Sequence, residues 1–171
     1  MRDRCRRHLG FVATVLALAL GLQGSATSEG GSIPETTIIK ALKEADAHFD
    51  ELSSSQRAIL WVTLLEAGKQ VEACKSVEVV AEFLSLCRHL GNADFAEFFQ
   101  EKTERVASQK PACYLNAWSS LDAQLRDCNR EALSHPIYLD QADINRALAP
   151  IDANRPGPHF FGEPSSRNEG N

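Results

Sequence analysis

Residues that break helices are scarce in the middle of this chain. Between Ser32 and Pro156 there are only two glycines, Gly68 and Gly91, and each closes an apolar segment. Glycine and proline are the residues that disfavour a helix most, and a glycine after an apolar segment is typical of a helix C-cap. No segment shows the apolar–polar alternation of a strand. We therefore predict an all-α fold, a compact bundle of five or six short helices.

Capping residues and first-turn prolines predict where these helices begin. The expected starts are the capping boxes at Ser32-x-x-Glu35, Ser53-x-x-Gln56 and Asp94-x-x-Glu97, a cap at Ser76, the proline Pro111, and a short helix over residues 139–148. The apolar spacing from Tyr114 to Cys128 predicts one helix after Pro111. Residues 58–65 (AILWVTLL) are apolar nearly all round, which is typical of a buried central helix.

The N-terminus has the three-part layout of a secretory signal peptide. Four arginines precede an apolar run of twelve over residues 11–22, and small residues follow up to Ala26. The run is short for a membrane-spanning helix, which needs about 20 apolar residues, so a retained anchor is the weaker alternative. We expect residues 1–26 to be cleaved and the protein to be secreted or periplasmic.

Cleavage would leave an acidic chain. Residues 1–26 carry four arginines and one aspartate, so the formal charge falls from −5 to −8. Such a surface repels nucleic-acid phosphates and gains nothing from anionic lipids. We therefore expect no nucleic-acid partner, and no stable membrane insertion after cleavage.

Four cysteines remain in the expected mature chain, and they predict two disulfides. An even number of cysteines in an exported chain favours disulfides, whereas a zinc site would need closely spaced pairs. On continuous helices Cys74 and Cys87 would lie about 20 Å apart, and Cys113 and Cys128 about 22 Å, too far for a bond within either pair.

Both bonds should therefore join different helices. If three successive helices run up, down and up, the pairs are Cys74–Cys113 and Cys87–Cys128. An antiparallel arrangement would instead pair Cys74 with Cys128 and Cys87 with Cys113.

Motifs of catalysis are missing from the sequence. There is no nucleophile elbow, no metalloprotease helix and no glycine-rich phosphate loop, so we predict no cofactor, no metal and no catalytic residue. Glu97, Glu101 and Glu104 share one helix face and could act as an acid–base pair, but exposed acidic faces are far commoner. A hydrolase with such a site is one alternative.

The composition changes after Pro150 to proline, glycine, asparagine, serine and charged residues. We divide the chain into a signal peptide (1–26), a helical domain (27–151) and a disordered C-terminal tail (152–171). Phe160 and Phe161 are the only large apolar side chains in the final segment. They could form a short motif for a protein partner, or be an ordinary pair in a disordered tail.

Three functional classes stay open. The leading hypothesis is an exported, non-enzymatic helical protein that binds another macromolecule, as an inhibitor, adaptor, immunity factor or secreted ligand. The second is a carrier of a small molecule in a pocket among four aromatic residues, Trp61, Phe83, Phe98 and Trp118. The third is the hydrolase with carboxylates at Glu97 and Glu101.

Overall fold

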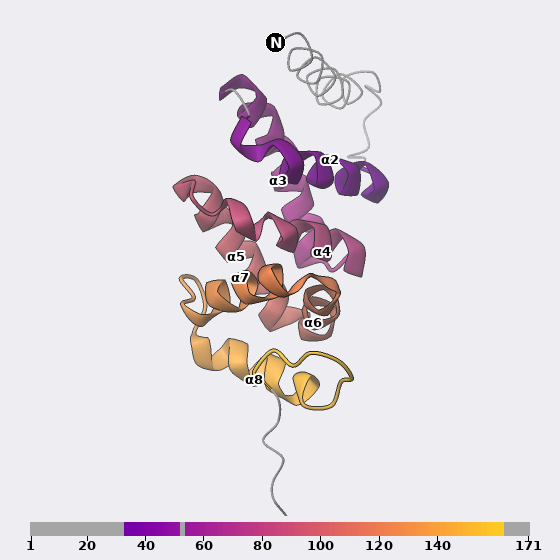
Figure 1. The fold of residues 1–171 in the computed structure, drawn as a ribbon, viewed down its shortest axis with the longest axis vertical. Helices are drawn as coiled ribbons and strands as arrows, with labels where there is room; N and C mark the ends of the chain where they lie inside the picture. Colours follow the sequence, from indigo (N-terminus) through magenta and orange to yellow (C-terminus); the bar gives the residue numbers. More distant parts are fainter. Residues whose placement is uncertain (1–32, 52–53, 163–171) are drawn as a thin grey trace, which may run out of the picture. The chain divides into compact units, whose positions relative to one another are not determined.

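The described part of the chain is helical throughout. The computed structural model describes residues 33–51 and 54–162, which hold seven α-helices, two 3-10 helices and no strand (Figure 1). The elements are α2 (Glu35–His48), η1 (Phe49–Glu51), α3 (Ser54–Glu72), α4 (Val77–Ser85), η2 (Leu86–His89), α5 (Ala93–Gln109), α6 (Pro111–Ser120), α7 (Ala123–Ser134) and α8 (Gln141–Asp152). The all-α prediction is confirmed. The expected signal peptide, Ser32 and Ser53 lie outside the described residues.

The described residues fall into two compact units, one up to Lys69 and one from Gln70 onward. In the first unit, α2 begins after Pro34, whose carbonyl oxygen accepts hydrogen bonds from Thr37 and Ile38. The buried face of α2 includes Ile38, Leu42 and Ala45, which follow the predicted helical spacing.

Helix α3 differs from its prediction in two respects. Gly68 does not end it, because the helix continues to Glu72. Leu60 and Leu64 are buried, but Val62 and Leu65 are exposed. The segment is therefore apolar on a face that meets solvent, and it is not buried all round. None of the described helices has both the length and the hydropathy that a membrane crossing requires.

The second unit holds the main core. Helix α4 packs against α6, α5 packs against α6 and α8, and α7 packs against η2. Phe83 and Phe99 stack at 5.3 Å between ring centroids, and Trp118 is fully buried. Burial of large aromatic side chains is the main stabilising term in a domain of this size.

Two helix starts in this unit confirm or refine the prediction. The Ser76 hydroxyl accepts the amide of Val79 at 3.1 Å and caps α4 as expected. Helix α5 is capped by Asn92, whose side chain accepts the amide of Phe95, and Asp94 lies within its first turn. The cap that starts this helix therefore lies two residues before the one expected at Asp94.

The single helix expected after Pro111 is two helices. Leu121 is extended, and the Asp122 carboxylate accepts the amide of Leu125 at 2.9 Å. This cap starts α7 in a new direction, although the apolar spacing continues across the break. The last α-helix, α8, spans Gln141–Asp152 and is longer than residues 139–148.

Both disulfides join the predicted cysteines. Cys74 bonds to Cys113 and Cys87 bonds to Cys128, with Cα–Cα distances of 6.4 and 6.1 Å. The antiparallel pairing and the zinc alternative are therefore wrong. The bonds flank α4 in the sequence and tie its two ends to α6 and α7.

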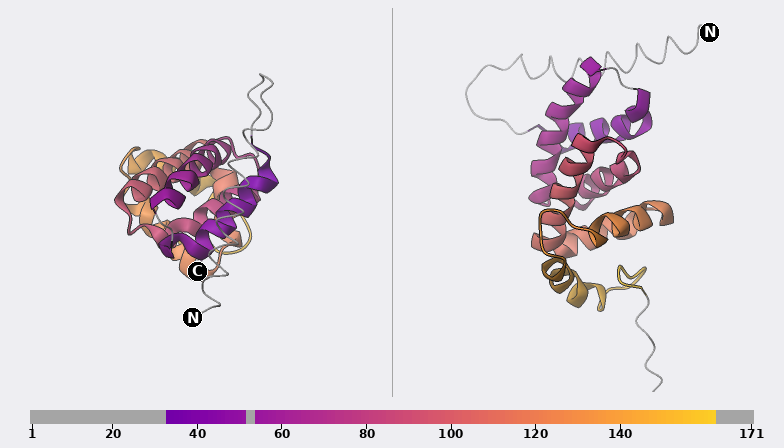
Figure 2. Two further views of the ribbon diagram at one scale, coloured as in Figure 1. Left: turned by 90° about the horizontal axis from the view of Figure 1, so that it is seen from above. Right: turned by 90° about the vertical axis from the view of Figure 1, so that its left-hand side faces the viewer.

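The expectation of disorder from Asp152 onward is wrong for residues 152–162. The chain after α8 turns back along the unit (Figure 2), and the Asp152 carboxylate accepts the amides of Phe160 and Phe161 at 2.8 and 3.2 Å. Phe160 is only 5 % exposed and contacts Tyr114 and Trp118 edge-on. Polar anchors to the folded body, which composition does not reveal, offset the ordering entropy of this segment. Residues 163–171 lie outside the described part.

Candidate functional site

Helices α7 and α8 are joined by a loop, residues 135–140, which we call the α7–α8 loop. Pro136 cannot donate a backbone hydrogen bond to a continuing helix, so α7 ends at Ser134. The Asp140 carboxylate then accepts the amide of Ala142 and caps α8.

A buried carboxylate on α5 holds this loop. Glu104 is fully buried, and its Oε1 accepts the amide of Ile137 at 2.7 Å. Its Oε2 accepts the amides of Tyr138 and Leu139 at 2.9 and 2.7 Å. A carboxylate can be buried only where hydrogen bonds replace its lost water, and here three backbone amides do so.

Gln100 secures the start of the same loop. It lies one turn before Glu104 on α5 and is buried. Its Nε2 donates to the carbonyl oxygens of Ala132 and His135, at 2.5 and 3.3 Å. Two buried polar side chains of α5 therefore fix the backbone from the end of α7 to Leu139.

The anchored backbone carries two large apolar side chains that face solvent. Ile137 is 65 % exposed and Tyr138 is 45 % exposed. Single exposed apolar residues are ordinary, but two neighbours on a backbone fixed by buried polar groups are unusual. Such a loop is ordered before binding, so a partner would spend little entropy in ordering it.

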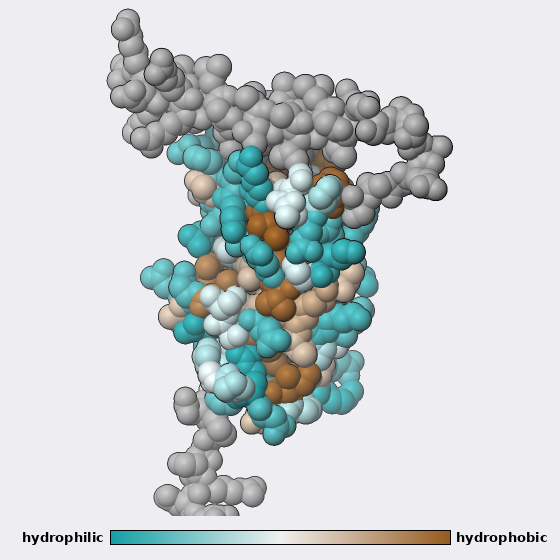
Figure 3. Space-filling model, turned by 90° about the vertical axis from the view of Figure 1, so that its right-hand side faces the viewer, coloured by the Kyte–Doolittle hydropathy of each residue, from teal (hydrophilic) through white to brown (hydrophobic). Residues whose placement is uncertain are grey.

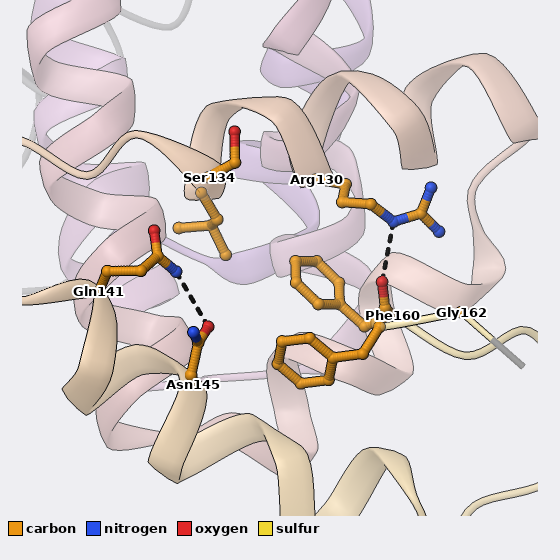
Figure 4. Close-up of a pocket in the computed structure, with 8 residues that line it drawn as sticks. Arg130, Ser134, Gln141, Asn145, Phe160 and Gly162 are labelled. Carbon is orange, nitrogen blue, oxygen red and sulfur yellow. Dashed lines mark hydrogen bonds between the residues drawn. The ribbon is translucent and has the colours of Figure 1, made fainter. Parts of the chain in front are cut away.

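A pocket of about 490 Å³ lies beside the loop (Figure 4). It is bounded by the last turn of α7, the first turn of α8 and the end of the described chain. Its lining consists of Arg130, Leu133, Ser134, Gln141, Asn145, Phe160, Phe161 and Gly162. Ser134 and Gln141 directly precede and follow the loop, so the pocket and the loop form one continuous surface.

Arg130 positions the aromatic wall of the pocket. Its Nε donates to the carbonyl oxygen of Phe160 at 2.8 Å (Figure 4), and its guanidinium pairs with Asp127 at 2.7 Å. The same guanidinium lies over the Trp118 ring, 5.4 Å from its centroid. Phe160 is therefore a core residue, whereas Phe161 is 48 % exposed at the rim of the pocket.

The two phenylalanines thus have different roles from those the sequence suggested. Burial removes Phe160 from any motif that a partner could reach. Phe161 stays a candidate for binding, on a folded surface and not in a disordered tail.

The opposite wall of the pocket is polar. The Nε2 of Gln141 donates to the Oδ1 of Asn145 at 2.9 Å. The Oε1 of Gln141 is buried and has no hydrogen-bond partner among the described residues. A buried acceptor without a donor is costly, and a ligand donor would reach this atom only if the Gln141 side chain turned to expose it.

Tyr114 is a second buried polar group close to this region. Its ring packs edge-on against Phe160, and its hydroxyl has no partner among the described residues. Burial raises the pKa of the phenol, and the nearby positive charge of Arg130 opposes this shift in part.

The glutamates proposed as an acid–base pair do not form a site. Glu101 pairs with Lys102 at 3.3 Å and with Arg105 at 3.1 Å, and Glu97 is exposed. Both carboxylate oxygens of Glu104, the third residue of that face, accept hydrogen bonds from backbone amides. Within residues 33–51 and 54–162 no group of three or more His, Cys, Asp or Glu could hold a metal ion.

The four aromatics expected to line a carrier pocket do not line this one. Trp61 belongs to the first unit, and the other three belong to the second. Phe83 and Phe98 pack against each other at 6.0 Å, and the Trp118 indole donates to the carbonyl oxygen of Arg126 at 3.0 Å. Phe83 and Trp118 belong to the core of the second unit, and Phe98 is half-buried beside Phe83.

Sequence reasoning missed Ile137 and Tyr138. The available signal was an apolar triplet directly after Pro136, in a segment with no helical periodicity. Elsewhere, the face drawn in Figure 3 also shows apolar patches separated by hydrophilic side chains. Exposure alone therefore does not single out the α7–α8 loop, but its anchoring does.

Comparison with known proteins yields no relative: no family model, no curated protein and no solved structure matches this chain.

Proposed function

We propose that this is an exported, non-enzymatic protein that acts by binding another protein. The binding surface consists of the α7–α8 loop, with Ile137 and Tyr138, and the adjacent pocket with Phe161 at its rim. We call this the loop–pocket surface. The observation that carries the proposal is the burial of Glu104, whose three hydrogen bonds hold two apolar side chains out in solvent.

The energetics support a role in binding. Full burial of a large apolar side chain stabilises a fold by about 1.5–3 kcal/mol. The fold loses part of this stabilisation at Ile137 and Tyr138, because both side chains are partly exposed. Desolvating a carboxylate adds a further cost, which the hydrogen bonds must offset. A fold that keeps both features is understandable if a partner covers the apolar pair, because aromatic and aliphatic anchors on rigid backbones dominate protein interfaces.

Export is supported by two separate features. The N-terminal sequence has the layout of a signal peptide, and two disulfides are typical of proteins from oxidising compartments. Intact-mass analysis of exported material should find a chain that begins near Thr27. Recovery of the full-length chain from a membrane fraction would contradict cleavage.

A carrier of small molecules is the second candidate, and the pocket volume favours it. A volume of about 490 Å³ falls within the range of ligand sites, and its lining mixes apolar and polar groups. This candidate predicts binding that needs Phe161 and Leu133 but not Ile137. The dependence of binding on Ile137, in the α7–α8 loop, therefore distinguishes the two functions.

Site-specific crosslinking in the native compartment tests the proposal. A photoreactive phenylalanine analogue at Tyr138 should capture a protein partner, and Ile137→Asp should reduce its recovery about tenfold or more. The matched control is Val77→Asp, which changes another exposed apolar residue at the first position of α4, where an acid suits the helix dipole.

Three outcomes would decide between the alternatives. Loss of the partner with Ile137→Asp but not with Val77→Asp, at an unchanged melting temperature, supports the proposal. Equal recovery with both variants contradicts it. Capture of a small molecule that survives Ile137→Asp would favour the carrier.

A further inference from the structure

We infer that the partner presents a peptide segment in which a large apolar side chain lies next to a lysine or arginine. This inference rests on the proposed function and specifies the chemistry of its partner. It is carried by two carboxylates that flank the α7–α8 loop and by the unpartnered acceptor in the pocket.

The first observation is an imbalance of charge at the loop. Glu131 and Asp140 stand before and after Ile137 and Tyr138 in the chain. Neither carboxylate has a lysine or arginine ion pair in the part of the chain that the structure describes. Glu131 is 78 % exposed at its side chain, and its contact with a basic residue among the described residues is with the His135 ring, at 3.6 Å.

Neighbouring carboxylates are treated differently. Asp127 pairs with Arg130 at 2.7 Å, and Asp143 pairs with Arg146 at 2.6 Å. Among the exposed acids of α7, α8 and the α7–α8 loop, the two without a lysine or arginine partner are therefore Glu131, in the last turn of α7, and Asp140, at the end of the loop. An incoming cation would find two carboxylates available, in a protein whose expected mature charge is −8.

The second observation is the donor requirement of the pocket. The Oε1 of Gln141, next to Asp140 in the chain, is buried and accepts no hydrogen bond from any residue that the structure describes. Lysine, arginine and backbone amides all supply N–H donors. A segment that enters the pocket from the loop side thus meets the negative charge of Asp140, and its N–H donor can satisfy the Oε1 of Gln141 once that side chain turns to expose the atom.

Arg130 does not oppose a cation at this end. Its nitrogen atoms contact the carbonyl oxygens of Phe160 and His159 and the carboxylate of Asp127. Figure 4 shows Arg130 and Gln141 on opposite sides of the phenylalanine rings. The apolar side chain of the partner would lie between them against Phe161, with its cation directed toward Gln141 and the loop.

Selection from random peptides of about twelve residues displayed on phage tests the inference with the intact protein as bait. The Ile137→Asp variant serves for counter-selection, so that only peptides that need the loop are kept. We expect the enriched peptides to carry a large apolar residue within a few positions of a lysine or arginine.

Charge variants then locate the interaction. Glu131→Gln with Asp140→Asn removes both carboxylates, and asparagine keeps the cap of α8. For an enriched peptide we expect about two- to tenfold weaker affinity at low ionic strength, and little difference at roughly 0.5 M salt. The control, Glu78→Gln with Asp94→Asn, makes the same change in net charge on α4 and α5 and should leave affinity unchanged.

The outcomes separate the two proposals. Loop-dependent peptides without lysine or arginine, or equal effects of the two charge variants, would overturn the inference and leave the proposed function standing. Enriched peptides that bind Ile137→Asp as well as the unaltered protein would count against the loop–pocket surface itself. Failure to enrich any loop-dependent peptide would count against both.

Discussion

Replacing Glu104 by glutamine should loosen the α7–α8 loop without changing the size of the buried side chain. The structure specifies which hydrogen bond is lost. Oε2 accepts two amides, those of Tyr138 and Leu139, whereas Oε1 accepts only the amide of Ile137. The glutamine oxygen should take the Oε2 position. Its NH2 group then faces the N–H of Ile137, and no hydrogen bond forms because both groups are donors.

The expected loss of stability follows from this count. One hydrogen bond to a charged group contributes about 1.5–3 kcal/mol, and the two that remain become neutral and weaker. We expect Glu104→Gln to lower the free energy of unfolding by about 2–4 kcal/mol. Glu104→Ala removes both acceptor oxygens, and with them all three hydrogen bonds, and leaves a cavity; it should cost about 3–5 kcal/mol, because the freed loop can then reach water.

Two measurements check this prediction. Chemical denaturation gives the change in unfolding free energy, and hydrogen exchange gives the local effect, in which the amide of Ile137 should lose more protection than amides in the middle of α5. Glu101→Gln is the matched control on the same helix. Its ion pairs are partly exposed, so the expected cost is below about 1 kcal/mol.

The reasoning would be refuted if Glu104→Gln cost less than about 0.5 kcal/mol, which is the size of an ordinary surface substitution. Unchanged exchange at Ile137 would refute it as well, because the loop would then be held by something other than the carboxylate. If the loop–pocket surface binds a partner, Glu104→Gln should also weaken that binding, although Glu104 is buried and cannot touch the partner.

Three further predictions concern the core. Tyr114→Phe should leave stability unchanged or raise it by up to about 1 kcal/mol, because it removes a buried hydroxyl without a described partner. Burial raises the pKa of this phenol, so the unaltered protein should lose stability above about pH 10, where the tyrosine of the unfolded chain ionises. The variant should lose less stability over the same pH range. Phe160→Ala should cost about 3–5 kcal/mol in thermal or chemical denaturation and Phe161→Ala less than about 1 kcal/mol, and similar costs would contradict the division between core and rim. Replacing Cys87 and Cys128 together by alanine should cost about 3–4 kcal/mol, and a smaller loss in denaturant titrations would show that the reduced chain keeps its structure.

Local signals in the sequence were enough to predict the fold class and the disulfides. The scarcity of glycine and proline predicts helices, and the cap at Ser76 is visible as a residue type. Distance along a helix excludes bonds within one helix, and an up, down and up arrangement of three successive helices then selects the observed cysteine pairs. The break between α6 and α7 was missed because Trp118, Leu121 and Leu125 keep helical spacing across it.

The candidate site depends on contacts between distant residues. The bonds from Glu104 to the loop span 33 to 35 positions, and Arg130 reaches Phe160 over 30. Neither periodicity nor composition reports on such pairs. The same limit explains the error at the C-terminus, where Asp152 and Arg130 order a segment whose composition is typical of disorder.

The two disulfides overlap along the chain, and this arrangement has a consequence for proteolysis. Cys87 lies inside the loop closed by Cys74 and Cys113, and Cys113 lies inside the loop closed by Cys87 and Cys128. A single cut anywhere between Cys74 and Cys128 therefore leaves the two fragments covalently joined.

The α7–α8 loop lies beyond Cys128, outside this protected stretch. A single cut there would leave α8 and the wall formed by Phe161 held only by noncovalent contacts. In a compartment rich in proteases, the loop–pocket surface would be lost first, while the disulfide-linked core persisted. Glu104 and Gln100, which keep the loop backbone ordered, would then slow cleavage of the loop.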